Sequence, residues 1–577
     1  MKPTIAALLG LCASVIAGDW PREMGPDGTG WVNEPINAAA VSREGGPAIA
    51  WSASAGVGGA SPICVAGKVY ALGGFTAGEE PSASSTPAKL AVHWDKPKNF
   101  TPLDIYLSAF DARDGRLLWR APVSKAEPIN RQSGIYASPT WYDGKVFVRT
   151  PRYVQAVDAG NGSELWRLDM MDAHQATTPC TEFVDTGKPG RGFMTGRGAP
   201  LVANGKLLVS FFTGETETSD KAEKQRYTSA TVVALDPGTG KELWKHKASP
   251  SARTFSTTVR TETGCDSWEP ALAAGNINSE PTVVMSTGHA DIGIDSATGE
   301  RRWIFHHAVE LPNIKPFVND RDSTSKRNPW PWWVGYGYVP PQVLIIDDIV
   351  ISRTFCGHGS LGTSLYAFDI RDKKPALLWQ TEELAARNVK YVVHDGRLYG
   401  IDLHTHLHTT KDHKIVEWPR PHRPEGMGQF QCRDIRTGRL LWSSDELLQS
   451  YNGPMHPHCE KGALEPGSCP ALNDWLRGKS EEGGYSYAGD PAFMISGDWV
   501  ILKGVRDSLS GLAFAKLTDH GLQRTGSKSF DWGHYYQGEP ALADGRLFVK
   551  LDSEKNGLDV AGKGNLVCFD LGGSAGR

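Results

Sequence analysis

The chain has 577 residues, of which 40% are hydrophobic, enough for a large core. Its 61 lysines and arginines nearly balance 65 aspartates and glutamates, which excludes the strongly basic surface of a nucleic-acid-binding protein or of one held on an anionic membrane. Gly (64), Pro (37) and Trp (19) are numerous, a composition that favours many short strands joined by turns.

Residues 1–18 are predicted to be a signal peptide. Lys2 precedes an apolar run over residues 5–16, and small residues follow at Ala17 and Gly18. That run is far shorter than the roughly 20 residues that span a bilayer, so a membrane anchor is disfavoured. A lipoprotein signal around Cys12 is disfavoured too, because the bulky Leu11 precedes the cysteine. We therefore expect a periplasmic or extracellular protein with no transmembrane span.

The cysteine count suits an oxidising compartment. Nine cysteines less Cys12 leave eight, an even number. Cys459 and Cys469 lie in one Pro- and Gly-rich loop and are the first candidates for a disulfide. The second candidates are Cys180 and Cys265, at corresponding positions of consecutive repeats. Two other cysteines, at positions 64 and 432, fall inside predicted strands, where buried free thiols are expected.

Two different hairpins recur along the chain after a turn-rich segment at 19–31 and a lone strand at 46–52. The first hairpin opens with a small or acidic residue and a proline, and its two strands are joined by a tight turn such as D-G-K. It starts at Ser61, Ser138, Ala199, Glu269, Asp490 and Glu539.

The second hairpin is typified by V-Q-A-V-D-A-G-N-G-S-E-L-W, from Val154 to Trp166. An aspartate closes its first strand, a glycine makes the turn, and the tryptophan ends its second strand. The aspartates of the successive copies are Asp111, Asp158, Asp236, Asp295, Asp369, Asp434 and Asp570. The last interval is 136 residues, about twice the others, so a degenerate copy is expected between them, after position 490 and around 512–514.

Eight repeats of four strands predict an all-β, eight-bladed β-propeller over residues 19–573. The tryptophan of each repeat is expected to pack between neighbouring blades. The last repeat stops after Asp570 and lacks its tryptophan strand. The lone strand 46–52, which contains Trp51, is expected to supply it, and this pairing would close the ring and remove an open edge.

The pattern A-x-D-x-x-T-G-x-x-x-W resembles the tryptophan-docking repeats of the quinoprotein (pyrroloquinoline quinone, PQQ) propeller superfamily. That superfamily includes PQQ-dependent alcohol dehydrogenases and the propeller lipoprotein of bacterial outer-membrane assembly. The segment from Asp19 to Gly30 looks like the W-P-x-x-x-G-P-x-G-x-G opening of secreted PQQ-like propellers of planctomycete-type bacteria. The resemblance covers residues 19–573 and is specific for a fold, which does not by itself imply an activity.

The chain departs from PQQ dehydrogenases in the residues of their chemistry. Those enzymes place an adjacent cysteine pair against the quinone, and no two cysteines are adjacent here. Their Asp-Asn pair for calcium and base has no counterpart that the pattern identifies, and the haem motif C-x-x-C-H is absent. Bound PQQ is therefore not expected, and no cofactor is predicted beyond a candidate metal ion.

The long connections of the predicted propeller share one face. Turns within hairpins are short, whereas connections between hairpins and between blades are long, and alternating strand direction puts all the long ones on the same side. Residues before the innermost strands would surround the axis there, and their aromatic and charged side chains suit a planar cofactor or a sugar. Packing between blades is the alternative for each residue. The candidate binding residues are Tyr136, Arg197, Trp268, Glu269, Tyr338, Tyr487, Asp490, His534, Tyr536 and Glu539.

A histidine-rich stretch is a candidate metal site. Period-two spacing puts His404, His406 and His408 on one face of a strand, and the next connection of the same blade carries His456 and His458. Imidazoles in this arrangement suit zinc or copper. The alternative is a strand with exposed histidines.

These observations predict an exported, monomeric scaffold that binds a small molecule, a glycan or an envelope protein and has lost its quinone site. The alternative is an enzyme on carbohydrate or alcohol substrates, either a PQQ-dependent oxidoreductase or a metal-assisted carbohydrate-active enzyme. In that case Glu269 and Glu539 could form an acid–base pair. The sequence identifies no catalytic residue and leaves open whether the protein is an enzyme.

Overall fold

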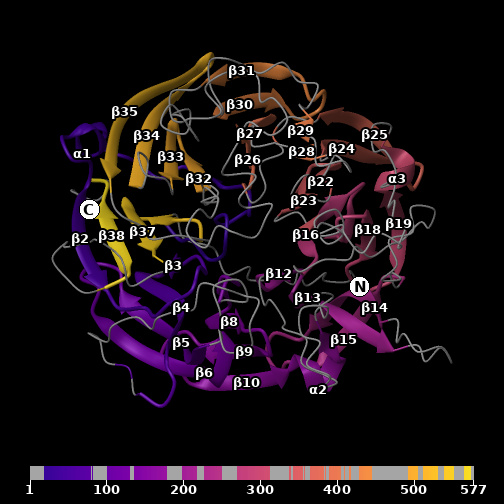
Figure 1. Ribbon diagram of the computed structural model, residues 1–577, viewed down its shortest axis with the longest axis horizontal. Coiled ribbons are helices and arrows are strands. Elements are labelled where there is room, and N and C mark those ends of the chain that lie inside the picture. The colour runs from indigo at the N-terminus through magenta and orange to yellow at the C-terminus, as the bar shows by residue number, and fades with distance from the viewer. Residues whose placement is uncertain are drawn as a thin grey trace, which may run out of the picture.

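Eight antiparallel sheets stand around one axis in the computed structural model, which confirms the eight-bladed β-propeller (Figure 1). The structure describes residues 18–79, 81, 101–129, 135–177, 198–216, 226–249, 269–311, 337–338, 342–354, 356–357, 364–381, 384, 389–403, 408–409, 415–416, 428–444, 492–504, 511–529, 538–551 and 564–572. Within these ranges, no helix has the length and apolarity needed to cross a bilayer.

Blades 1 to 4 follow one another along the chain, each with four antiparallel strands. Blade 1 has β3 (Ile63–Val65), β4 (Lys68–Thr76), β5 (Thr101–Asp111) and β6 (Leu117–Ile129). Blade 2 has β7 (Thr140–Tyr142), β8 (Lys145–Arg149), β9 (Tyr153–Asp158) and β10 (Glu164–Asp169). Blade 3 has β12 (Leu201–Ala203), β13 (Lys206–Thr216), β14 (Arg226–Leu235) and β15 (Glu242–Lys247). Blade 4 has β16 (Ala271–Ile277), β17 (Glu280–Ser286), β18 (Ala290–Asp295) and β19 (Arg301–His306).

Blades 5 to 8 complete the ring. Blade 5 has β21 (Leu344–Ile346), β22 (Ile349–Arg353), β24 (Leu365–Arg371) and β25 (Lys374–Thr381). Blade 6 has β26 (Val392–His394), β27 (Arg397–Leu403), β30 (Gly428–Asp434) and β31 (Leu440–Ser444). Blade 7 has β32 (Ala492–Ser496), β33 (Trp499–Gly504), β34 (Gly511–Thr518) and β35 (Gly521–Ser529). Blade 8 has β36 (Ala541–Ala543), β37 (Arg546–Lys550), β38 (Leu566–Asp570) and β2 (Ala48–Ala53).

The remaining elements are short. They are β1 (Trp31–Val32), β11 (Ala176–Thr177), β20 (Gly337–Tyr338), β23 (Cys356–Gly357), β28 (His408–Thr409), β29 (Ile415–Val416), α1 (Ala38–Ser42), α2 (Met170–His174) and α3 (His307–Glu310). β1 adds to blade 7 parallel to β32, and β11 adds to blade 3 beside β13. The other four strands form two separate pairs, β20 with β23 and β28 with β29.

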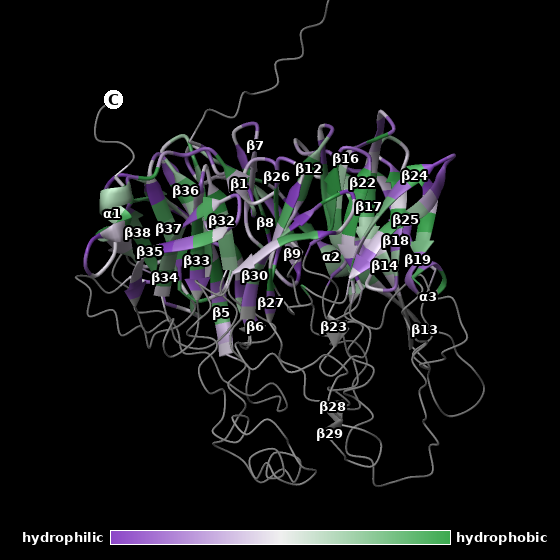
Figure 2. Cartoon of the chain, turned by 90° about the horizontal axis from the view of Figure 1, so that it is seen from above, coloured by the Kyte–Doolittle hydropathy of each residue, from purple (hydrophilic) through white to green (hydrophobic). Residues whose placement is uncertain are grey.

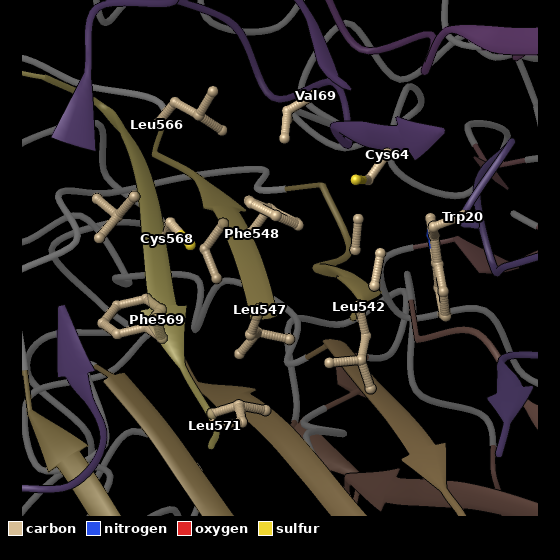
Figure 3. Packing of buried hydrophobic residues seen from close by; sticks show 14 of the residues in the cluster. Trp20, Cys64, Val69, Leu542, Leu547, Phe548, Leu566, Cys568, Phe569 and Leu571 are labelled. Carbon is tan, nitrogen blue, oxygen red and sulfur yellow. The ribbon is translucent and has the colours of Figure 1, made fainter. Parts of the chain in front are cut away.

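The ring is closed as the sequence predicts. β2 pairs antiparallel with β38, and Trp51 lies opposite Cys568 in that ladder. The predicted degenerate copy is blade 7, whose outer strand β35 has no tryptophan. Figure 3 shows the apolar residues of blade 8 facing those of blade 1, including Phe548 and Cys64. The N-terminal strand β2 therefore completes the last blade, which packs against the first.

The repeated tryptophan docks on the turn of the next blade. A methyl group at the turn glycine Gly162 would lie 2.6 Å from the ring of Trp119, and one at Gly240 would lie 2.7 Å from the ring of Trp166. The Nε1–H of Trp166 also donates to the Pro237 carbonyl over 3.1 Å. The prediction that the tryptophans join neighbouring blades is confirmed. A side chain at this turn position would collide with the tryptophan ring. The φ of Gly162 is also +80°, a backbone conformation that glycine adopts without strain, so both features favour glycine here.

Burial changes from the inside of each blade to the outside. In blade 2, β8 and β9 are buried along almost their whole length because neighbouring blades cover both faces, whereas β10 has exposed and half-buried residues but no fully buried one. Figure 2 shows the hydrophobic residues concentrated within the blades and polar residues at the turns. The free cysteines Cys64 and Cys432 are buried in strands β3 and β30, as predicted.

Candidate functional site at the propeller axis

One register position places a side chain beside the axis in most blades. The innermost strand of these blades ends at a turn residue with positive φ. We call the position five residues before that turn residue the lead-in position. In blade 2, for example, Ser138 precedes the turn residue Asp143 by five. The lead-in residues of blades 1, 2, 3, 5, 6 and 8 are Ser61, Ser138, Ala199, Gln342, Lys390 and Glu539.

Three lead-in residues are connected by hydrogen bonds. The Ser61 hydroxyl donates to Glu539 Oε2 over 2.9 Å, and the Ser61 backbone N–H donates to the Ser138 hydroxyl over 3.0 Å. Lys390 reaches Glu539 Oε1 at 3.1 Å. Blades 8, 1 and 2 are thus linked at one level of the axis, and blade 6 is joined to blade 8 across the position of blade 7.

An N-terminal segment, residues 20–30, crosses the axis; we call it the strap. Its Pro21 carbonyl accepts from the Trp141 N–H of blade 2 over 2.7 Å, and its Thr29 carbonyl accepts from the Val393 N–H of blade 6 over 3.0 Å. Blades 2 and 6 stand opposite each other in a ring of eight. A segment bonded to both therefore passes over the axis.

Glu23 of the strap completes a buried charge cluster with Lys390 and Glu539. Lys390 Nζ lies 2.5 Å from Glu23 Oε1 and 3.1 Å from Glu539 Oε1, and the lysine side chain is 11% exposed. Burial raises the pKa of Glu23 against the opposing charge of Lys390. Burial also acts to raise the pKa of Glu539, but Lys390 and the hydrogen bond from Glu23 outweigh it and lower that pKa. Lys390 therefore lies between two carboxyl groups whose pKa values are shifted in opposite directions.

Arg149 and Glu269 form a second buried pair. Arg149 Nη2 lies 3.3 Å from Glu269 Oε1, and the side chains are 0% and 4% exposed. The same guanidinium donates to the carbonyls of Gly198 and Ser210 in blade 3. Burial lowers the pKa of Arg149, and the charge of Glu269 opposes that change. The pair thus joins blade 2 to the residue that precedes the innermost strand of blade 4.

Arg149 belongs to a set of buried cations that occupy the same position in their blades. In each blade the second strand pairs with the third, and the cation is the fifth residue of the second strand in that pairing. The others are Arg353, Lys503 and Lys550 of blades 5, 7 and 8. Each reaches residues just before the innermost strand of the next blade. Arg353 bonds Tyr391 Oη at 3.4 Å, Lys503 donates to the Gly538 carbonyl, and Lys550 donates to the Gly58 carbonyl. These buried cations fasten neighbouring blades.

A further polar network joins blades 4 and 5. Tyr366 Oη donates to Asp291 Oδ2 over 2.6 Å and lies 2.5 Å from His307 Nε2, while Ser352 Oγ donates to Asp291 Oδ1 over 2.9 Å. All four side chains are buried. Burial raises the pKa of Tyr366 well above its ordinary value, and the Asp291 charge adds to that effect.

Three of the ten predicted binding residues have described side chains. Glu269 and Glu539 are buried and ion-paired, and Tyr136 is half-buried. The first two stand in opposite blades, and the structure pairs each with a different cation rather than with the other. Tyr338 lies in β20, but its side chain is not among those that the structure describes. The residues outside the described ranges are Arg197, Trp268, Tyr487, Asp490, His534 and Tyr536.

The metal and disulfide candidates also lie outside most of the described chain. His408 falls in β28 without a described side chain. His404, His406, His456, His458, Cys180, Cys265, Cys459 and Cys469 are outside the described ranges altogether. Among the residues that are described, no group of three or more His, Cys, Asp or Glu side chains could hold a metal ion.

Sequence reasoning missed Lys390, Arg149 and Glu23. A signal existed for Lys390, because counting five residues back from the Asp395-Gly396 turn identifies it as a lead-in residue. Comparing the last residues of the second strands would have found Arg149. No spacing rule predicts Glu23, since the strap lies outside the repeats.

Residues 105–318 match the protein family PQQ_2, described as outer membrane protein assembly factor BamB. Quinohemoprotein alcohol dehydrogenase from Comamonas testosteroni is 13% identical, with 98% of this chain and 82% of that chain covered and a TM-score of 0.49. BamB from Moraxella catarrhalis is 11% identical, with 84% and 99% covered and a TM-score of 0.40. No curated protein matches the sequence. Likenesses this distant carry no argument on function, and the family match, with its docking repeats, supports the PQQ-like β-propeller superfamily.

Proposed function

We propose that the protein is an exported scaffold that binds a ligand or another protein and lacks the quinone site of PQQ dehydrogenases. One observation carries the proposal: the described carboxylates at the axis are held in buried ion pairs within the protein itself. Glu269 is bound by Arg149, and Glu539 is bound by Lys390 and by the Ser61 hydroxyl.

Those pairs count against acid–base chemistry by the two predicted carboxylates. A general acid must carry a proton that it can release, and the lowered pKa of Glu539 keeps this group ionised. Glu269 is likewise held in an ion pair by the buried Arg149 guanidinium. Both carboxylates therefore act here as ion-pair partners that fix blade positions.

The cysteines are also unlike a quinone site. The sequence contains no adjacent pair. The described cysteines Cys64, Cys432 and Cys568 are buried and free in three different blades, packed among apolar side chains. The cysteines of this chain therefore offer no adjacent pair against which a quinone could lie.

The binding surface would be the face where the lead-in ends of the innermost strands lie; we call it the long-loop face. Antiparallel order brings the β8–β9 turn, α2 and α3 to this face, and the D-G turns to the opposite, short-turn face. Rigid blades fixed by buried pairs suit a scaffold that presents connections on one side. The family match to an outer membrane protein assembly factor fits an interaction role in the envelope.

Site-specific photo-cross-linking tests this surface. A photoreactive residue at Asp172 or Val309, both exposed on the long-loop face, should give discrete adducts with one partner in envelope preparations. The same residue at Asn161 or Lys373 on the short-turn face is the matched control and should give none. Adducts from the short-turn face alone would contradict the proposal.

A second experiment separates the scaffold from the oxidoreductase. Native mass spectrometry with elemental analysis of the exported protein measures any bound quinone or metal directly. We expect no PQQ, and no dye-linked alcohol oxidation after PQQ and calcium are added. Stoichiometric PQQ in the isolated protein would overturn the proposed loss of the quinone site.

A further inference from the structure

We propose that the strap, residues 20–30, is a built-in plug that closes the short-turn end of the propeller axis and ties blades 1 and 2 to blades 6 and 7, with Glu23 as its lock. This role of the strap in holding the ring together goes beyond the proposed function and does not depend on it.

The flanks of the strap are fixed at the short-turn face. Before it, Asp19 Oδ1 accepts from the Ala66 N–H in the turn of blade 1 over 2.8 Å. After it, the Val32 carbonyl accepts from the Gly497 N–H in the turn of blade 7 over 2.8 Å. Both contacts are made at turns that end innermost strands, so the strap begins and ends at the same face.

The middle of the strap goes deeper. Glu23 contacts Lys390 and Glu539, which lie at the opposite, lead-in ends of the innermost strands of blades 6 and 8. The segment therefore enters at the short-turn face, reaches down along the axis and returns to that face. This course fills the axis from one end.

Tight packing accompanies the charge contacts. Trp20 and Met24 are 1% and 4% exposed, and Met24 belongs to the apolar cluster that contains Val392 of blade 6. A methyl group on Gly30 would lie 2.5 Å from Met24 Cε and 2.7 Å from Val392 Cγ2. The strap thus fits the inner wall of blade 6 without spare room.

The strap differs from the other N-terminal tie. β2 closes blade 8 by a strand ladder at the outer edge of the ring. The strap instead spans the axis through a few backbone bonds and one charge cluster. Glu23 Oε1 lies 2.5 Å from the Lys390 ammonium group, and losing it would leave that buried group with one acceptor fewer, so the Glu23 side chain is the contact that holds the middle of the strap in place.

Hydrogen exchange measures this tie directly. The backbone N–H groups of Trp141, Val393 and Ile495 donate to the carbonyls of Pro21, Thr29 and Gly30 of the strap. In Glu23→Ala we expect about ten- to hundredfold faster exchange at these three amides, because losing the lock lets the strap open locally. Exchange along the β2–β38 ladder should stay unchanged.

Two further variants make the test decisive. Glu23→Gln keeps the shape of the side chain and an oxygen that can accept from Lys390, and should show a smaller rise at the same amides; it also serves if Glu23→Ala does not fold. Lys516→Met removes an exposed pair with Asp498 in blade 7 and is the matched control, expected to leave strap exchange unaltered. Wild-type exchange at all three amides in both Glu23 variants would overturn the proposal, as would an equal rise along β2–β38.

Discussion

The outer hairpins and the lead-in ends of the blades contrast with each other. Outer hairpins repeat one contact around much of the ring, a tryptophan against the turn glycine of the next blade, as with Trp119 on Gly162 and Trp379 on Gly438. Lead-in positions are occupied by Ser, Ala, Gln, Lys and Glu in different blades. The repeated tryptophan–glycine contact is one that docks neighbouring blades, whereas the lead-in residues differ from blade to blade and are specific to this chain.

Burial and turn hydrogen bonds shift the pKa values of carboxyl groups in opposite directions. Hydrogen bonds from Arg302, with backbone donors of the turn, lower the pKa of the outer aspartate Asp295 to about 2. Burial raises the pKa of the carboxyls Glu23 and Glu127. The turn aspartate Asp295 is therefore stabilised in its charged form, and these two buried carboxyls in their neutral form.

The largest expected effect is in the inner region. Arg149→Met should lower the free energy of unfolding by about 3–5 kcal/mol, because it leaves Glu269 buried without its cation. Urea denaturation followed by tryptophan fluorescence measures the change.

The matched double variant Arg149→Met with Glu269→Gln should recover part of that loss, since the uncompensated charge is gone. Lys516→Met, at an exposed pair, should cost at most about 1 kcal/mol. Equal costs for Arg149→Met and Lys516→Met would remove the distinction between the inner pairs and surface pairs.

A second prediction tests the outer docking contact. Gly162→Ala should cost about 2–4 kcal/mol, because a Cβ there meets the Trp119 ring while φ is +80°. Gly144 is the matched control: its φ is +71° and nothing lies within 4 Å of an added Cβ. Gly144→Ala should therefore cost only about 1–2 kcal/mol of backbone strain. Similar melting temperatures for the two variants would argue against docking of the tryptophan ring on this glycine as a source of stability.

The sequence predicts the outer hairpins better than it predicts the contacts at the lead-in ends of the blades. The D-x-x-T-G-x-x-x-W pattern predicts the strands, the turns and the docking contact because all three depend on residues close together in the chain. The closure by β2 was predictable too, since the last repeat lacks the strand that the first residues provide.

The charge clusters were predicted only in part. Glu269 and Glu539 were identified as residues before innermost strands, but their partners Arg149 and Lys390 belong to other blades. Which cation meets which carboxylate depends on the angle between blades, and no local pattern encodes that angle. The contacts of Glu23 could not be predicted, because Glu23 lies in a segment without periodicity and its partner Lys390 is far away in the sequence.

A third, smaller effect is expected where blades 4 and 5 meet. Tyr366→Phe removes the hydrogen bond to Asp291 and leaves that buried carboxylate with Ser352 and His307. We expect a loss of about 1–3 kcal/mol in unfolding free energy. Ser352→Ala, which removes a different bond to the same carboxylate, is the companion variant, and the double variant should lose less than the sum of the two. Additive losses would show that the two bonds do not act as one network.

The smallest effect is a pH dependence that separates the buried Glu127 from the turn aspartate Asp295. Glu127 is 7% exposed and accepts from the Thr150 hydroxyl, and burial raises its pKa to about 7. A folded-state pKa above the unfolded value gives stability that is complete in acid and is lost as pH rises through about 7. The Asp295 contribution has the opposite sign, since its pKa of about 2 means that its stability is lost only as pH falls toward that value. Glu127→Gln should therefore flatten the fall in urea midpoint between pH 5 and pH 8 and leave the acid limb unchanged, because the amide cannot ionise. An unaltered slope between those pH values would mean that Glu127 does not titrate there, and that its burial does not make its response to pH differ in sign from that of Asp295.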